Sequence, residues 1–239
     1  HLESCGFQRC RSNPIVFYHP VRDIMTLVHG YDYASAGNGE HMRWLQVELE
    51  KRCELNTTVI GTEAGDLEEG LILNRVLRVT EAWWEHEADL RHAELFIEQL
   101  HLDGSKPVST PGIEDSEAQQ EEELELSQRV VREHRGVAAR GNYLGADRPD
   151  VQFAVKEICG HMAVPTQGGV RKLKHLARYL LKFPELAFHY PWLHEAEAET
   201  VDVYTESDWA GCRATRKSTS GGVVMLGGGI LKSWSKTQG

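Results

Sequence analysis

The sequence predicts an α+β fold in which short β-hairpins alternate with amphipathic helices. Apolar runs of strand length at 15–18 and 25–28 flank a break at Pro20, which is a hairpin pattern. Between 150 and 162, apolar residues recur at helical spacing, as Val151, Val155, Ile158 and Met162. A strand from Val201 leads into a glycine-bounded hairpin near the end of the chain. Together these patterns favour separate strand-rich and helix-rich regions.

The amino-terminal part is expected to contain two helices and a further pair of strands. The first helix follows Gly37-Asn38-Gly39 and buries Leu45 and Leu49, and the second places Leu90, Ala93, Ile97 and Leu100 on one face. The predicted elements are a helix over 40–52, strands over 71–79 and 83–86, and a helix over 89–100.

An acidic segment divides the chain. The formal net charge of the 239 residues is −10, and most of it comes from seven carboxylates within 114–125 that have no base among them. The segment follows Pro107, Pro111 and Gly112, which break regular structure. We therefore predict a solvated connector over 104–122, with its acidic part as a linker.

Three more helices and an extended segment are predicted after the connector. Pro149 opens the second of these helices, and Thr166 is a candidate N-cap for the third. The helices are expected over 123–144, 150–162 and 167–183, followed by an extended stretch over 186–190.

The cysteines and the apolar runs bound the class of protein. Five scattered cysteines argue against a disulfide framework and favour a reducing compartment, and Cys5 and Cys10 are too isolated in sequence to indicate a zinc site. No apolar run reaches the length of a membrane span, so we expect an intracellular protein, cytoplasmic or nuclear, with no membrane partner. An initial His in place of Met predicts that the sequence begins inside a longer reading frame.

One predicted helix carries a basic face. Five basic residues fall at offsets 0, 3, 4, 7 and 11 of the helix over 167–183, opposite a face of leucine and alanine: Arg171, Lys174, His175, Arg178 and Lys182. Such a stripe can follow a phosphate backbone, and losing one base would then weaken binding without changing sequence preference. The alternative is a solvated face, or one paired with the acidic connector.

The motif at 204–211, Tyr-Thr-Glu-Ser-Asp-Trp-Ala-Gly, is followed by Arg-Lys-Ser-Thr-Ser-Gly at 216–221 and Ser-Trp-Ser-Lys-Thr-Gln at 233–238. This stretch resembles the ribonuclease H segment of the Pol polyproteins of copia-type LTR retrotransposons. In that family the segment continues into a helix with a second catalytic Glu, so the resemblance implies that this chain holds only the start of the fold.

Earlier segments resemble the same polyproteins in the same order. The stretch His29-Gly30-Tyr31-Asp32 aligns with the Tyr-Val-Asp-Asp box of the reverse transcriptase. Segment 106–111 resembles the family's Lys-Pro-Val-x-Thr-Pro, and 148–155 its Arg-Pro-Asp-Ile-x-Phe-Ala-Val. The helix ending in Ala-Arg-Tyr-Leu at 177–180 resembles a helix of the region between the two enzymes.

The resemblance implies an RNA-directed DNA polymerase with an associated ribonuclease H, both dependent on Mg²⁺. It implies Asp32, Glu206 and Asp208 as catalytic residues, Asp32 and Glu206 as metal ligands, and RNA, DNA, an RNA–DNA hybrid and the rest of the polyprotein as partners. It also implies a division into a palm and thumb portion at 1–112, an acidic linker at 113–123, a helical connection at 124–195 and a truncated ribonuclease H-like hairpin at 196–239.

Two departures from the family pattern change the expected activity. Tyr31 stands where the family has the first carboxylate of its box, and a neutral phenol is a poor Mg²⁺ ligand. Glu206 stands where the family has Asp, which moves the carboxylate by one methylene. We therefore predict a catalytically silent fragment. The alternatives are a nucleic-acid-binding or interaction module without catalysis, and an enzyme completed by flanking sequence.

Overall fold

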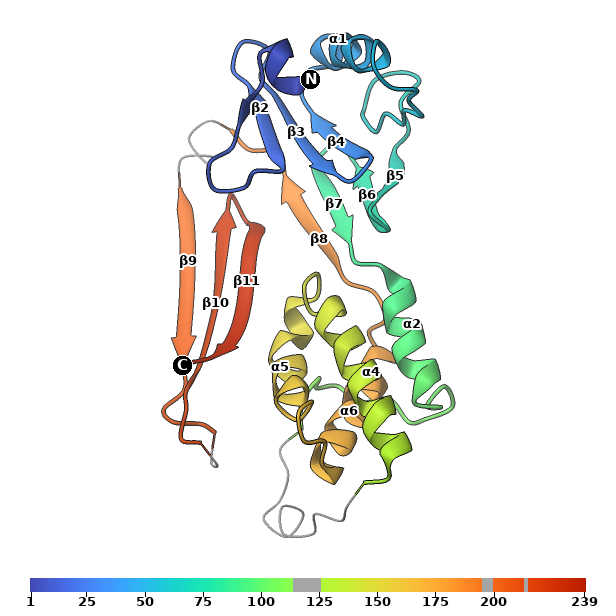
Figure 1. The fold of residues 1–239 in the computed structure, drawn as a ribbon, viewed down its shortest axis with the longest axis vertical. Helices are drawn as coiled ribbons and strands as arrows, with labels where there is room; N and C mark the ends of the chain where they lie inside the picture. The colour runs from blue at the N-terminus through green and yellow to red at the C-terminus, as the bar shows by residue number, and fades with distance from the viewer. Residues whose placement is uncertain (114–125, 195–199, 213–214) are drawn as a thin grey trace. The chain divides into compact units, whose positions relative to one another are not determined.

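The computed structural model describes residues 1–113, 126–194, 200–212 and 215–239 (Figure 1). The chain divides into two compact units, His1–Val59 and Ile60–Gly239. The predicted acidic linker lies almost wholly outside the described residues, so the four-part division expected from the sequence stays a prediction.

The first unit is an antiparallel sheet packed against one helix. Strands β1 (Gln8–Arg9), β2 (Val16–His19), β3 (Ile24–His29) and β4 (Asp32–Ala36) are hydrogen-bonded in that order, after a short 3-10 helix η1 (Leu2–Cys5). Helix α1 (Gly39–Glu50) begins at Asn38, whose side chain accepts a hydrogen bond from the Glu40 amide. Its buried Leu45 and Leu49 complete the core with four further apolar side chains: Leu2, Phe7, Phe17 and Ile24.

The turn between β3 and β4 contains only two residues, Gly30 and Tyr31. His29 faces Asp32 across the two strands, and Gly30 has a φ of +61°. A positive φ at the first central residue is what a type II′ hairpin turn requires, and glycine adopts it without a Cβ clash. The stretch that aligns with the polymerase box therefore lies in a strand-turn-strand.

The second unit contains a four-stranded antiparallel sheet that joins distant parts of the chain. Strands β5 (Glu69–Ile72), β6 (Arg75–Val79) and β7 (Trp83–Glu87) form a meander, and β8 (Ala187–Pro191) pairs with β7. Trp83 stacks on His189 across this pairing, with ring centroids 5.0 Å apart. The extended stretch predicted after the helices is therefore the edge strand of a sheet that begins before the connector.

A helical core follows this sheet in the same unit. It consists of α2 (Leu90–Gln99), α4 (Gln128–Leu144), η2 (Pro149–Val151), α5 (Gln152–Gly160) and α6 (Gln167–Leu180). Fourteen buried side chains from these elements form one cluster, with Phe96, Ile158, Leu173 and Leu176 among the most deeply buried. Thr166 caps α6 by accepting a hydrogen bond from the Gly169 amide, as predicted.

A three-stranded antiparallel sheet ends the chain. Its order is β11 (Gly229–Thr237), β10 (Thr219–Leu226) and β9 (Val201–Ser207), so β9 is an edge strand, and every residue of β9 is exposed. Helix α5 holds the sheet through two hydrogen bonds, Gln152 to Ser233 at 2.9 Å and Lys156 to Thr219 at 2.7 Å. The glycine-rich stretch at 227–229 forms the hairpin expected there.

Within the part of the chain that the structure covers, no helix combines the length and the apolar character needed to cross a bilayer.

Candidate functional site

Asp32, the carboxylate left in the polymerase-like box, lies at the start of β4 on the two-residue hairpin turn. Its side chain is exposed, and the neighbouring Tyr31 at the tip of the turn is fully exposed. The turn positions Asp32 opposite His29. A carboxylate at an exposed hairpin tip keeps its water shell and has no second carboxylate beside it in the box.

The two nuclease-like carboxylates have different surroundings. Glu206 is exposed on β9 and faces Gly221 of β10. The Asp208 carboxylate accepts hydrogen bonds from the backbone amides of Thr219 at 2.6 Å and Gly211 at 3.4 Å. The amide of Thr219 is the main reason that the pKa of Asp208 lies below its usual value. Asp208 thus closes the loop between β9 and β10 through Oδ1, which is a structural use of that oxygen.

These carboxylates do not fit a magnesium centre. Mg²⁺ takes hard oxygen ligands in near-octahedral geometry, and two-metal catalysis needs several clustered carboxylates. Among the described residues, one group of three potential metal ligands is found. None of Asp32, Glu206 and Asp208 belongs to it. Asp32 belongs to the first compact unit and the other two belong to the second.

The basic face of α6 exists, and part of it is covered by residues 106–110. Leu173, Leu176, Ala177 and Leu180 are buried on the opposite side of the helix, as predicted. The Arg178 guanidinium donates to the Lys106 carbonyl at 2.6 Å, and Lys182 donates to the Ser109 hydroxyl at 2.8 Å.

The contact between this segment and α6 is continuous. The His175 ring lies 2.9 Å from the Thr110 carbonyl oxygen, and the Val108 amide donates to the Arg178 carbonyl. The first part of the predicted solvated connector is therefore bound to the helix, through neutral backbone and hydroxyl oxygens. Of the five basic residues, Lys174 and Lys182 remain exposed and Arg171, His175 and Arg178 are partly covered.

The sequence pattern did not indicate that Arg148 is buried. Arg148 is 1% exposed, and its Nε and Nη2 donate to the two oxygens of Asp150 at 2.9 and 2.8 Å. The same guanidinium donates to the carbonyls of Phe183 and Pro184, beyond the end of α6. Tyr179 donates to Asp150 at 3.0 Å. In the sequence, Arg-Pro-Asp at 148–150 was the signal that could have indicated this interaction. In the structure, Arg148 fastens η2 to the chain that leaves α6.

Three curated proteins of Arabidopsis thaliana are similar to this chain. An uncharacterised mitochondrial protein is 31% identical over 152 residues, which cover 61% of this chain and 58% of that protein. The retrovirus-related Pol polyproteins from transposons RE1 and RE2 are each 29% identical over 150 residues, or 63% of this chain and 10% of the polyprotein. The chain thus spans little more than half of the first relative and a tenth of the other two. The similarity supports a segment of a retrotransposon Pol polyprotein.

No protein-family model matches the sequence, and no solved structure matches the fold.

Proposed function

We propose that the chain is a segment of a retrotransposon Pol polyprotein, running from the end of a reverse transcriptase into the start of a ribonuclease H, and that it is catalytically silent as it stands. The observation that carries the origin is the similarity to two Pol polyproteins over 63% of the chain. The mixture of helices and antiparallel sheets is compatible with such a segment. The ancestral reaction would be DNA synthesis on an RNA template with cleavage of RNA in the hybrid.

We expect no catalysis because of the surroundings of the three carboxylates. Magnesium-assisted phosphoryl transfer needs ligands that hold the ion and orient the attacking and leaving oxygens. Asp32 lies on an exposed turn, and the Oδ1 of Asp208 already accepts two backbone amides. Glu206 keeps an exposed carboxylate, but a single oxygen ligand binds Mg²⁺ weakly. We therefore assign no catalytic step to these residues.

Primer extension tests the proposed alignment of the polymerase box. The chain is joined to an intact upstream palm from a related polyprotein, and Tyr31 is compared with Tyr31→Asp, which restores the first carboxylate. The expected result is no extension with Tyr31 and Mg²⁺-dependent extension with Tyr31→Asp. Equal extension by both proteins would show that Tyr31 does not occupy the position of a metal ligand.

A second function, binding of nucleic acid without catalysis, is favoured by the basic face of α6. Against it, the segment over 106–110 already takes hydrogen bonds from Arg178 and Lys182. Binding of an RNA–DNA hybrid that weakens steeply with salt, and that Lys174→Ala reduces, would support it. Affinity independent of salt, or unchanged in Lys174→Ala, would exclude this face as the binding surface.

A further inference from the structure

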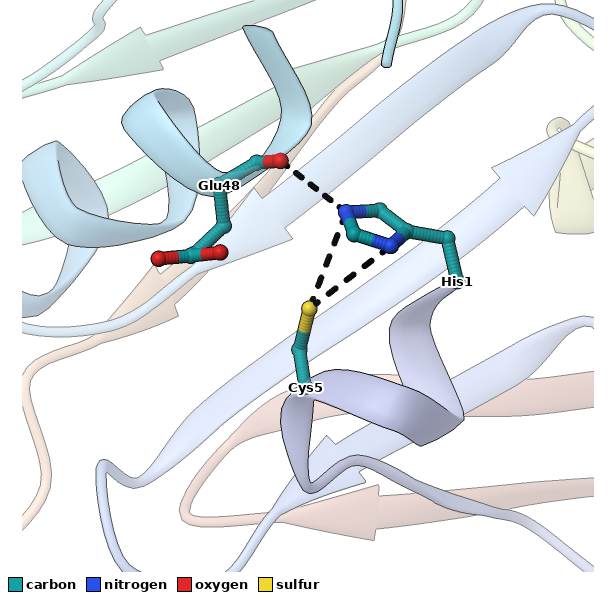
Figure 2. A group of neighbouring side chains, drawn as sticks. All are labelled: His1, Cys5 and Glu48. Carbon is teal, nitrogen blue, oxygen red and sulfur yellow. Dashed lines mark hydrogen bonds between the residues drawn. The ribbon is translucent and has the colours of Figure 1, made fainter. Parts of the chain in front are cut away.

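His1, Cys5 and Glu48 lie together where η1 meets α1 in the first compact unit (Figure 2). Each residue offers one ligand atom, and these atoms all lie within 4.8 Å of one another. His1 and Cys5 lie at the two ends of η1, and Glu48 lies in the last turn of α1. His1 and Cys5 are four residues apart in the sequence, and tertiary structure brings Glu48 to them.

One ring nitrogen of His1 contacts the backbone of α1. Its Nε2 lies 2.9 Å from the backbone oxygen of Glu48, and with the proton on Nε2 this is a hydrogen bond (Figure 2). That tautomer leaves the lone pair of Nδ1 for a metal. A ring N–H donated to a backbone carbonyl is the usual second contact of a ligating histidine, because it fixes both the tautomer and the orientation of the ring.

The Cys5 thiol lies close to the His1 ring. Its Sγ is 3.9 Å from Nδ1 and 3.7 Å from Nε2 (Figure 2). Zinc bonds of about 2.0 Å to nitrogen and 2.3 Å to sulfur, at a tetrahedral angle, place the two ligand atoms about 3.6 Å apart. Because Sγ lies about as near to Nε2 as to Nδ1, the imidazole and the thiol would have to turn, by more than about 1 Å at the sulfur, before both could bond one ion.

Glu48 supplies the third ligand. Its side chain is about one-fifth exposed, and one carboxylate oxygen pairs with the exposed Lys51 at 2.5 Å, which leaves the other oxygen for a metal. A thiolate and an imidazole select zinc and similar soft transition ions, whereas Mg²⁺ selects oxygen ligands. We propose that His1, Cys5 and Glu48 form a zinc-binding site with water in the fourth position. This site is separate from the carboxylates of the proposed ancestral enzyme.

A bound ion would stabilise the first unit. This unit ends at Val59, and its core consists of six buried apolar side chains, which is a small core. Small domains commonly gain stability from a metal or a disulfide, and binding free energy at a site absent from the unfolded chain becomes folding free energy. By joining η1 to the end of α1, the ion would connect the two ends of this core.

The test is titration of the full chain with cobalt(II), whose thiolate charge-transfer absorption reports a Cys–metal bond. The protein carries no polyhistidine tag, and it has two additional residues before His1 so that a free α-amino group cannot chelate the ion together with the imidazole. We expect a one-to-one complex from which zinc displaces cobalt. Cys5→Ser should lose the absorption band, and Glu48→Gln should bind at least about tenfold more weakly.

The matched control is Cys10→Ser, because the Cys10 thiol contacts the Ser12 hydroxyl at 3.2 Å and lies outside the cluster. It should bind cobalt like the parent chain. A parent chain without the band, a band that survives in Cys5→Ser, or an equal loss in Cys10→Ser would overturn the proposal.

Thermal unfolding provides a second readout that does not depend on the absorption of a thiolate–metal bond. Zinc should raise the unfolding midpoint of the parent chain and of Cys10→Ser by several degrees, and that of Glu48→Gln by less at the same zinc concentration. An equal rise in Glu48→Gln would exclude the carboxylate as a ligand. Neither readout involves nucleic acid, so failure of the zinc site leaves the proposed function untouched.

Discussion

Replacing Arg148 by alanine should destabilise the second unit more than any surface substitution. The guanidinium is buried and makes four hydrogen bonds, two to Asp150 and one each to the carbonyls of Phe183 and Pro184. Alanine removes all four and leaves the Asp150 carboxylate with the Tyr179 hydroxyl as a remaining donor. The substitution therefore leaves the Asp150 carboxylate without its cation and the carbonyl oxygens of Phe183 and Pro184 without this donor.

The magnitude follows from the burial of the partners. Breaking a buried ion pair costs about 3–5 kcal/mol when the remaining charge is fully buried. The Asp150 side chain is 22% exposed, so water recovers part of its solvation and the lower end applies. We expect a loss of about 3 kcal/mol in the free energy of unfolding, which corresponds to about 6–12 °C in the unfolding midpoint of a domain of this size. Arg148→Lys keeps the charge but loses the bidentate geometry, and should cost about 2 kcal/mol.

Urea denaturation followed by tryptophan fluorescence measures these differences, because five of the six tryptophans lie in the second unit. The matched control is Arg129→Ala, which removes an exposed pair with Glu133 one helical turn away and should cost less than about 0.5 kcal/mol. If Arg148→Ala were no more destabilising than Arg129→Ala, the guanidinium would not be fastening η2 to the end of α6.

Three other predictions concern stability. Burial lowers the pKa of His134, so the unfolded chain binds the proton more readily and stability should fall as the pH drops below about 6.5; His134→Leu should flatten this dependence of the unfolding midpoint between pH 7.5 and 5. Leu73 has a φ of +51° in the turn between β5 and β6, a left-handed conformation that asparagine adopts more easily than leucine. Leu73→Asn should therefore raise the free energy of unfolding by about 1 kcal/mol, and a decrease would show that the Leu73 backbone is not strained. Gly222→Ala would place a Cβ inside the ring of Trp234, so it should lower the unfolding midpoint, whereas Gly221→Ala, where the nearest atom is 3.8 Å away, should change it little.

The sequence predicted the type and approximate bounds of most elements because local periodicity determines them. The strand expected over 71–79 was wrong, since β5 and β6 are separated there by a turn at Leu73 and Asn74. The helix over 40–52 is observed as α1, and the hairpin patterns at both ends of the chain are observed as β2–β3 and β10–β11. The cap residues Asn38 and Thr166 act within one turn of their helices, so their positions could also be derived from short-range pattern.

Contacts between distant segments could not be derived in the same way. Nothing local indicates that β8 pairs with β7, or that residues 106–110 lie along α6, because proline and glycine in that segment indicate only a break in regular structure. The cluster of His1, Cys5 and Glu48 is not local either, since Glu48 is distant in the sequence from His1 and Cys5 and joins them only on folding. Asp208 was expected as a catalytic residue from the resemblance, and its hydrogen bonds to the Thr219 and Gly211 amides are visible only in the structure.

Cleavage of the RNA strand of an RNA–DNA hybrid tests the central claim most directly. The purified 239-residue chain is incubated with labelled hybrid and Mg²⁺, with and without a chelator, beside Asp208→Asn. Because Asp32, Glu206 and Asp208 do not belong to a cluster of potential metal ligands among the described residues, we expect no cleavage above background from either protein. Cleavage that the chelator abolishes and Asp208→Asn removes would show that these carboxylates do hold a catalytic metal.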